Sequence, residues 1–339
     1  MNVALKTPDL IGKTPLVKLA SLSRLINREI FLKCEYANPG GSVKDRAAKF
    51  MILDALDSGN LKPGMTIIEG TAGNTGIGLA VMAKAMGFEL TAVLPKGQAA
   101  EKERMIELFG AQLKLVDPVP FKNQNHFYHT ARRIAEAEPD KYWWANQFEN
   151  LSNFKAHFQE TGPEIKQQLS GRFDALVSVA GTGGTIGGNS AFLKEQIPSL
   201  EVVLIDPHGS GLKSYLETGE FKSEGSSFTE GIGIMRLVAN FAKAKVDRAI
   251  SLPDSDLVTI ARYVRDEDGI LLGSSAALNV AGAVHTALRL RPGKRVVTFA
   301  CDLGERSTSK LYNPEFLKER GIVSESQSID DFLKKYQGA

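Results

Sequence analysis

The hydrophobic positions of the chain gather into short, almost wholly apolar runs that recur along most of its length. Runs that are apolar on both faces and bounded by Gly, Pro or Asp are typical of buried strands in a parallel sheet. Five runs predict strands, at residues 66–68, 90–94, 176–179, 202–205 and 296–299.

Amphipathic segments lie between these runs and predict helices. One reaches residues 81–86 before Gly87, and another spans residues 100–109 before Gly110, where glycine favours helix termination. Because strands alternate with helices, the pattern predicts an α/β protein with parallel sheets.

The chain is polar from about residue 322 onward, apart from one short amphipathic pattern. Its apolar positions have helical spacing, and Ser328 precedes them as a suitable N-cap. We therefore expect residues 322–339 to form a polar C-terminal tail that docks on the protein. The apolar positions are Ile329, Phe332, Leu333 and Tyr336.

Composition narrows the class of protein. The 339 residues are 43% hydrophobic and 24% charged, an ordinary globular balance with enough length for two lobes. The net charge is +2 with scattered lysines and arginines, which argues against a nucleic-acid partner. Two cysteines, Cys34 and Cys301, favour reduced thiols over a disulfide framework. The chain has no signal-peptide pattern and no run of about 18 apolar residues, so we expect a cytoplasmic protein without a membrane span.

Residues 38–48 predict a junction between a strand and a helix, with Lys44 in the first helical turn. Ser42 is the expected N-cap. A lysine at the positive end of a helix dipole is favoured as a neutral amine, which Schiff-base chemistry requires. A solvated lysine on a surface helix is the plainer alternative. The expected buried face comprises Val43, Ala47, Met51 and Ala55.

Two glycine-rich turns follow predicted strands and begin predicted helices. Free backbone N–H groups in the turn at residues 69–78 would bind an anion such as a substrate carboxylate. The turn at residues 181–185 has the form of an anion-binding nest with adjacent hydroxyls, suited to a phosphate monoester. The first turn lacks the spacing of a dinucleotide loop, and the second lacks the acidic residue that Mg²⁺ with a nucleoside triphosphate would need. Plain tight turns remain the alternative for both.

Other segments carry less information. Residues 269–277 are small and by themselves predict only a closely packed helix start. His126 and His129 have helical spacing, but no carboxylate completes a metal site, so no metal is expected. Trp143 and Trp144 are interpreted as core residues.

These segments together resemble the fold-type II pyridoxal-phosphate enzymes, specifically the cysteine synthase (O-acetylserine sulfhydrylase) and cystathionine β-synthase branch. The likeness covers roughly residues 8–320. It rests on ordered motifs: I-G-K-T-P-L at 11–16, the lysine motif at 39–47, G-N-T-G-I-G-L-A at 73–80, Q-F-E-N at 147–150, G-T-G-G-T at 181–185 and E-G-I-G at 230–233.

The resemblance implies a pyridoxal 5′-phosphate site. Lys44 corresponds to the Schiff-base lysine that also removes the α-proton, and Asn74 to the partner of the cofactor's 3′-oxygen. Ser275 corresponds to the hydroxyl at the pyridine nitrogen, which leaves the ring a weaker electron sink than a carboxylate would. The phosphate cup corresponds to Gly181, Thr182, Gly183, Gly184 and Thr185.

The resemblance also implies a substrate site. Its carboxylate-binding residues correspond to Thr71, Gly73, Thr75 and Gln147, while Gly231 and Gly233 correspond to the loop over the mouth of the site. The sequence departs from the family in three places. Ala72 replaces the usual serine of the carboxylate loop, residues 275–277 read S-A-A, and residues 301–306 read C-D-L-G-E-R without the serines common there.

The implied activity is β-replacement: O-acetylserine and sulfide give cysteine and acetate through an aminoacrylate. Cystathionine β-synthase and cysteine desulfhydrase remain alternatives, as does an idle regulatory homologue, although Lys44 argues against that. Arg236 is the one cation that we place near the mouth, so we expect O-acetylserine, and not O-phosphoserine, as the donor.

The resemblance implies two lobes, each a mostly parallel sheet flanked by helices. We expect a smaller, mobile lobe at residues 38–149 and a larger lobe from residues 1–37 and 150–321 that carries the phosphate cup. Residues 1 to about 18 are expected to cross to a second subunit of a homodimer. A C-terminal peptide of serine acetyltransferase is a further possible partner.

Overall fold

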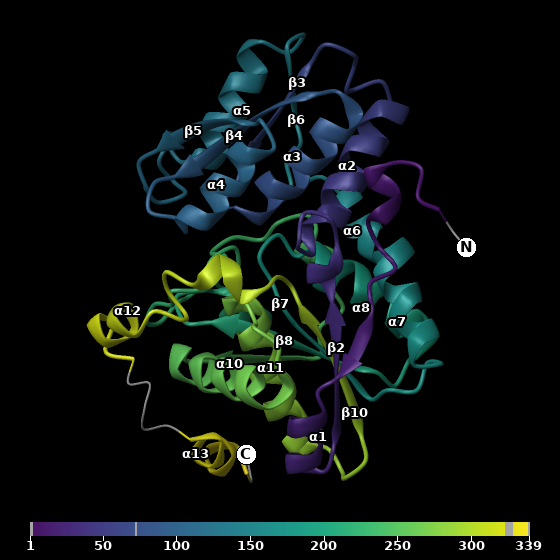
Figure 1. The fold of residues 1–339 in the computed structure, drawn as a ribbon, viewed down its shortest axis with the longest axis vertical. Helices are drawn as coiled ribbons and strands as arrows, with labels where there is room; N and C mark the ends of the chain where they lie inside the picture. Colours follow the sequence, from purple (N-terminus) through teal and green to yellow (C-terminus); the bar gives the residue numbers. More distant parts are fainter. Residues whose placement is uncertain (1–2, 72, 323–327, 338–339) are drawn as a thin grey trace.

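The structure is a computed structural model that describes residues 3–71, 73–322 and 328–337. Its strands form two sheets, one above the other in Figure 1, each flanked by helices. The larger sheet has the order β1 (Leu16–Lys18), β2 (Glu29–Cys34), β10 (Arg295–Ala300), β7 (Ala175–Val179), β8 (Glu201–Pro207) and β9 (Arg248–Leu252). The smaller has the order β5 (Gln112–Val116), β4 (Glu89–Pro95), β3 (Thr66–Gly70) and β6 (Tyr142–Trp144).

All strand pairs are parallel except β1, which is antiparallel to β2. The expected α/β class with two lobes is therefore confirmed. The smaller sheet lies within residues 66–144, inside the expected smaller lobe, but the exact lobe boundaries and the mobility stay predictions.

The α-helices and the 3₁₀ and π segments connect these strands. The α-helices are α1 (Ala20–Ile26), α2 (Lys44–Asp57), α3 (Asn74–Met86), α4 (Ala100–Leu108), α5 (Phe127–Ala137), α6 (Ser152–Ala156), α7 (Gly162–Gln168), α8 (Gly184–Gln196), α9 (Leu212–Thr218), α10 (Asp254–Asp268), α11 (Ser274–Arg289), α12 (Pro314–Glu319) and α13 (Ile329–Tyr336). The 3₁₀ segments are η1 (Thr7–Leu10), η2 (Glu35–Ala37), η4 (Phe241–Lys243) and η5 (Gly304–Ser307), and η3 (His157–Thr161) is a π-helix.

Each of the five apolar runs lies within a strand: β3, β4, β7, β8 and β10. All of their side chains except the partly buried Thr66 and Thr91 are buried, because helices cover both faces of the sheets; α11, for example, packs on β7 and β10. Gly87 ends α3 in the left-handed conformation, with φ of +77°. The predicted helix at 100–109 is α4, which ends one residue earlier.

The start of α2 bears out the capping contact that the sequence predicts. The assigned helix begins at Lys44, but Val43 before it already has helical backbone angles, with φ of −58° and ψ of −21°. The Ser42 hydroxyl accepts from the Lys44 N–H at 3.3 Å, which is the bond that an N-cap makes. Tertiary contacts hold this segment in place, because Ser42 forms a β-bridge with Asp302 and the Val43 N–H donates to the Cys301 carbonyl. The expected inner face of the helix is buried.

The C-terminal tail docks as expected over its described part. Ser328 caps α13 in a capping box, and Phe332 is fully buried against the core of the larger lobe. The Tyr336 hydroxyl donates to Asp256 of α10. Residues 323–327 and 338–339 of this tail lie outside the described residues.

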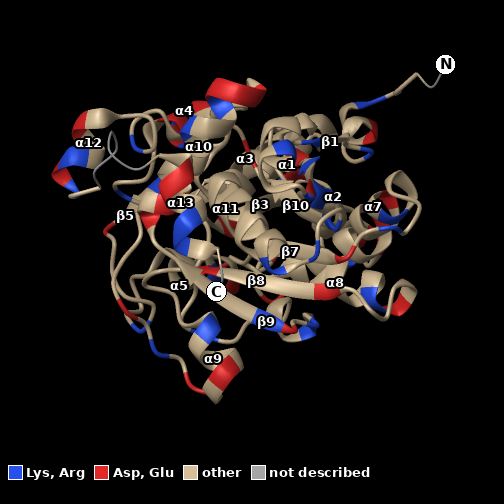
Figure 2. Cartoon of the chain, turned by 90° about the horizontal axis from the view of Figure 1, so that it is seen from below, with Lys and Arg blue, Asp and Glu red and all other residues tan. Residues whose placement is uncertain are grey.

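Charges of both signs alternate over the outer helices, as α9 and α12 illustrate in Figure 2. Among the described residues, no helix combines the length and the apolar character that crossing a bilayer requires.

Candidate active site

One cavity of about 350 Å³ collects almost all of the predicted site residues. Its size lies in the range of small-molecule sites. The carboxyl ends of β3 and β7 and the amino ends of α2, α3, α8 and α11 contribute to its wall, which is where ligands bind in parallel α/β sheets. Of the predicted set, Gly184 alone does not line it.

Lys44 is the first residue of α2 and lines the cavity. Burial lowers the pKa of its amine, and the positive charge of Lys102 lowers it further. The interactions with Cys301 and Asp302 act in the opposite direction and raise it. The direction of this shift favours the neutral amine that a covalent bond to a carbonyl requires.

The predicted phosphate cup is the turn between β7 and α8. The first-turn N–H groups of α8 have no intrahelical acceptor, so they form an anion site. Gly183 has φ of +83°, and a Cβ there would lie 2.5 Å from the Phe241 backbone. Gly184 faces away from the cavity because it packs on the Asn153 side chain. The cup therefore depends on glycines for close packing on both of its sides.

Two buried side chains hold the hydroxyls of the cup. The Asn153 amide donates to Thr182 Oγ1 at 2.9 Å, and His157 Nε2 lies 3.3 Å from Thr185 Oγ1. Burial lowers the pKa of His157 to about 3, so its ring is neutral near pH 7. The ring sits at the start of η3, and π-turns of this kind frequently occur at functional sites.

The predicted carboxylate loop forms the opposite wall. The Thr71 hydroxyl accepts hydrogen bonds from the N–H groups of Gly73 at 3.0 Å and Gly76 at 3.3 Å. These two backbone donors are therefore already engaged, and Thr71 organises the loop. Ala72, the departure noted in the sequence, lies outside the described residues.

Gln147 is fixed against this loop. Its Oε1 accepts from the Thr75 hydroxyl at 2.5 Å, and its Nε2 donates to the Gly70 carbonyl at 2.9 Å. The Glu69 carboxylate beneath it is completely buried, and this burial raises its pKa to about 8. Glu69 Oε1 accepts from the Gln147 N–H at 3.4 Å.

Asn74 joins the two lobes. Its amide donates to Asp302 at 2.6 Å and its carbonyl oxygen accepts from Arg306 at 3.0 Å. Both partners belong to the C-D-L-G-E-R segment that departs from the family pattern. The role of Asn74 toward the cofactor stays a prediction.

Ser275 lies in the first turn of α11, 7% exposed, beside the thiol of Cys301. Burial raises the pKa of Cys301 to about 12, so the thiol remains protonated at neutral pH. Cys301 also lines the cavity, and the Asn279 amide donates to its sulfur at 3.4 Å.

The loop with Gly231 and Gly233 lies over the cup. The Gly233 N–H donates to the Ala180 carbonyl at 2.8 Å, and the Gly231 carbonyl packs so tightly on Gly181 that a side chain there would collide with it. Beyond the loop, Arg236 pairs with Glu149. Its guanidinium lies 4.5–5.2 Å from the ring centroids of Phe121, Tyr128 and Phe148.

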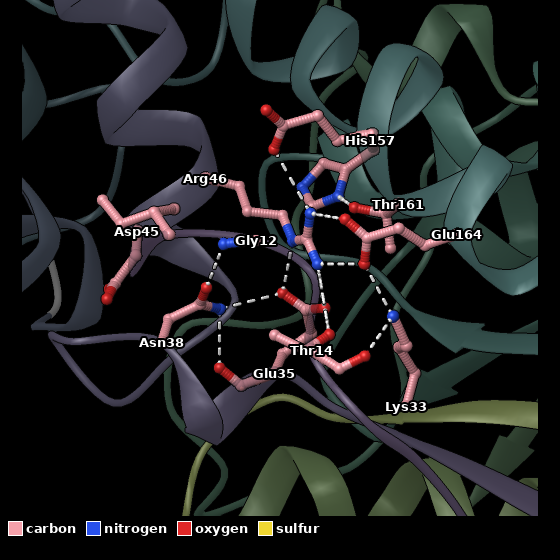
Figure 3. Close-up of polar contacts among 12 residues, drawn as sticks. Gly12, Thr14, Lys33, Glu35, Asn38, Asp45, Arg46, His157, Thr161 and Glu164 are labelled. Carbon is pink, nitrogen blue, oxygen red and sulfur yellow. Dashed lines mark hydrogen bonds and ion pairs between the residues drawn. The ribbon is translucent and has the colours of Figure 1, made fainter. Parts of the chain in front are cut away.

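A buried ionic network fixes the helix that carries Lys44 (Figure 3). Arg46 donates to Glu35 at 2.8 and 3.0 Å and to Glu164 at 2.7 and 2.8 Å. Lys33 completes the charge balance with a 2.7 Å contact to Glu164. Burial would raise the pKa of Glu164, but its ion pairs outweigh this and lower it to about 2.

Some features of the cavity gave no signal in the sequence. Lys102 and the aromatic residues at 121–128 reach it from segments with ordinary amphipathic or loop patterns. The His126 and His129 side chains hydrogen-bond within their own segment, and no metal-binding cluster of His, Cys, Asp or Glu is found among the described residues.

A family model described as pyridoxal-phosphate dependent enzyme matches residues 7–302. The chain therefore belongs to the pyridoxal-phosphate-dependent enzymes, and its cofactor is pyridoxal 5′-phosphate. Within that class the chain is similar to cysteine synthase 2 of Schizosaccharomyces pombe and to a cysteine synthase of Dictyostelium discoideum. Each is 42% identical over 96% of this chain, covering 88% and 89% of the relative.

A solved structure, O-acetylserine sulfhydrylase isoform 3 from Entamoeba histolytica, is similar with a TM-score of 0.86 and 31% identity. The likeness covers 100% of this chain and 97% of the other. The cavity fits the cofactor, because an amine favoured in its neutral form, a backbone anion nest and a buried hydroxyl all line it.

Proposed function

We propose that this protein is a cysteine synthase that converts O-acetylserine and sulfide to cysteine and acetate. The observation that carries the proposal is the meeting of Lys44, the glycine cup at 181–185 and the loop at 71–75 in one cavity. When bound, pyridoxal phosphate supplies an electron sink for the α-carbon of the substrate.

Lys44 has two roles in this proposal. Its neutral amine would hold the cofactor covalently, and the same amine is the base that would take the α-proton of the substrate. Burial lowers the pKa of this amine, which favours the unprotonated form that can accept a proton.

The remaining predicted site residues bind and orient. The α8 N–H groups with Thr182 and Thr185 hold the cofactor phosphate, and Ser275 donates a hydrogen bond toward the ring nitrogen. Gln147 keeps one amide hydrogen beyond its bond to Gly70, so it can donate to the substrate carboxylate.

The charges in the cavity favour a donor with a neutral ester. Besides Lys44, the cations lining it in the described chain are Lys102 and Arg236, and each is paired with a carboxylate. A phosphate dianion brings two negative charges, but Glu149 balances Arg236, and the lysines at Glu230 exceed it by only one positive charge. We therefore keep O-acetylserine over O-phosphoserine.

Turnover tests this proposal. The purified holoenzyme should form cysteine from O-acetylserine and sulfide faster than cystathionine from serine and homocysteine. Lys44→Ala should abolish this turnover, and borohydride reduction followed by mass spectrometry should label the Lys44 peptide of the parent only. Rapid cystathionine formation with little cysteine formation would instead favour the cystathionine β-synthase alternative.

We further propose a cytoplasmic homodimer whose N-terminal segments cross between subunits. Val3, Leu5 and Leu10 are 79%, 90% and 55% exposed in the single chain, which leaves apolar surface for a partner. Light scattering of the full chain and of a chain without residues 1–10 should give a dimer and a weakened dimer. A serine acetyltransferase C-terminal peptide, if it binds, should compete with O-acetylserine.

A further inference from the structure

A charged cluster in the cavity wall has no role in the mechanism above. Lys102 of α4 donates to Glu230 at 2.6 Å, and Lys310 donates to the other oxygen of the same carboxylate. We call these three residues the Lys102–Glu230–Lys310 triad. Lys102 and Glu230 line the cavity, and Lys310 approaches from outside it.

Lys102 lies against the predicted substrate loop. Its side chain is only 6% exposed, and its carbon stem packs on Gly73 so closely that any Cβ at Gly73 would collide with it. The positive charge of Lys102 is also near enough to Lys44 to contribute to the lowered pKa of that amine. Lys102 therefore lines the cavity with its stem on Gly73 and its ammonium group on Glu230, and its surroundings are protein more than water.

The triad carries one uncompensated positive charge, because two lysines share one carboxylate. Burial would raise the pKa of Glu230, but Lys102 and Lys310 outweigh it and lower the pKa, so Glu230 is ionised. The neighbouring Glu101 does not cancel the excess inside the cavity. Its carboxylate bonds Thr308 and Ser309 and does not line the wall. Arg236 differs, since Glu149 compensates it one to one.

The proposed reaction moves two monoanions through this chamber. Acetate leaves as the β-substituent is eliminated, and hydrosulfide then enters. We propose that Lys102 is the binding site for these monoanions, and that Glu230 and Lys310 are positioning residues that hold its ammonium group and set its net charge. This inference rests on the proposed function and adds to it the group that handles leaving and incoming anions.

The competing interpretation is purely structural. Lys102 belongs to α4 beside the smaller sheet, while Glu230 and Lys310 belong to the larger lobe, so the triad could act only as a contact between lobes. The two interpretations predict different changes in anion binding. Anion capture predicts opposite changes for the Lys102 and Glu230 variants, whereas a purely structural contact does not. Loss of Lys102 and loss of the Glu230 charge both break the contact, but the first removes positive charge and the second exposes it.

The experiment measures acetate binding to the holoenzyme, from the change in cofactor absorbance, at low and high ionic strength. Lys102→Gln should weaken acetate binding by about tenfold, the loss expected for a hydrogen bond to a charged group. Glu230→Gln should strengthen it by about two- to threefold, and Lys310→Gln should weaken it by a similar factor, both effects shrinking in salt. Lys96→Gln, at an exposed ion pair with Asp117, is the matched control and should change nothing.

Steady-state kinetics provide the second readout. Lys102→Gln should lower kcat/KM for sulfide while the KM for O-acetylserine changes little. If Lys102→Gln and Glu230→Gln shift acetate binding in the same direction, or if neither shifts it, the triad is a structural contact and the inference is overturned. The binding assay needs no turnover, so a parent protein that makes no cysteine would contradict the proposed function separately.

Discussion

At the scale of single residues, Glu69 is a titratable group whose burial is only partly compensated by hydrogen bonds. One carboxylate oxygen meets the Gln147 N–H, whereas the other has no hydrogen-bond partner in the structure. Burial raises the pKa from 4.5 to about 8, so the folded protein keeps this proton while the unfolded chain loses it at lower pH. Between these values the free energy of unfolding should fall as pH rises.

The variant Glu69→Gln tests the predicted fall of the unfolding free energy with rising pH. The variant cannot ionise at this position, so its unfolding free energy relative to the parent should rise from pH 5 to pH 8 and then level off. Urea titrations across this range measure it. A difference that is constant with pH, or one that decreases, would show that Glu69 is ionised in the folded protein. Asp117→Asn, at an exposed pair, should give no such slope.

Residue-scale chemistry was predictable where it depended on neighbours in sequence. The lysine motif and the two glycine turns follow from local patterns, whereas the role of Ser275 came only from the family resemblance; all of them line the cavity. Lys102 and Glu230 are 128 positions apart, and nothing local marks either as a partner of the other. The capping contact of Ser42 with Lys44, by contrast, was predictable because it joins neighbours in sequence.

At the scale of elements, the β7–α8 turn should tolerate no side chain at Gly183. Gly183→Ala should lower the affinity for pyridoxal phosphate by about tenfold or more, because the new Cβ displaces the turn from Phe241. Titration of apoenzyme with cofactor, followed by absorbance, measures this.

Gly219 gives the matched control for that change. It ends α9 with φ of +80°, close to the +83° of Gly183, but has open space around its Cα. Gly219→Ala should cost about 1 kcal/mol of stability and leave cofactor affinity unchanged. Equal cofactor affinities in the two variants would show that the cup has no steric requirement for glycine at position 183.

The C-terminal helix α13 depends on one buried anchor. Phe332 is fully buried against the larger core, so Phe332→Ala should cost about 3–5 kcal/mol or release the helix locally. Limited proteolysis and thermal unfolding would detect this, with exposed Lys334→Ala as the control. Unchanged protease resistance in the Phe332 variant would mean that Ser328 and Asp256 suffice to hold the helix.

At the scale of the whole molecule, the Arg46 network joins α2 to the body of the larger lobe. Arg46→Met should cost about 3–5 kcal/mol, because it leaves the completely buried Glu35 without its cation. Adding Glu35→Gln should recover part of this loss. Chemical denaturation of the single and double variants measures both. The exposed ion pair between Lys96 and Asp117 is the comparison. Lys96→Met should lower the free energy of unfolding by no more than about 1 kcal/mol.

The two-lobed arrangement could be predicted only in outline. Strands β3, β4, β7, β8 and β10 were visible as apolar runs, whereas β5 and β6 are at most partly buried, so their hydrophobic signal is weak. The order of the larger sheet depends on which strands pair across the whole chain. That pairing reflects the packing of both sheet faces, which no local pattern contains.

The sheet order has a consequence for synthesis on the ribosome. The smaller sheet is complete once residue 144 has emerged, but β2 pairs with β10, in a register that places Glu29 opposite Arg295. At translation rates of about 5–20 residues per second, the first strands wait roughly 10–50 s for their neighbour. During that interval the antiparallel pair of β1 and β2 presents an open edge, the kind of surface on which nascent chains aggregate. A ribosome that stalls late in the message would leave that edge permanently uncovered, so quality control of this protein should depend on its last strand more than on any catalytic residue.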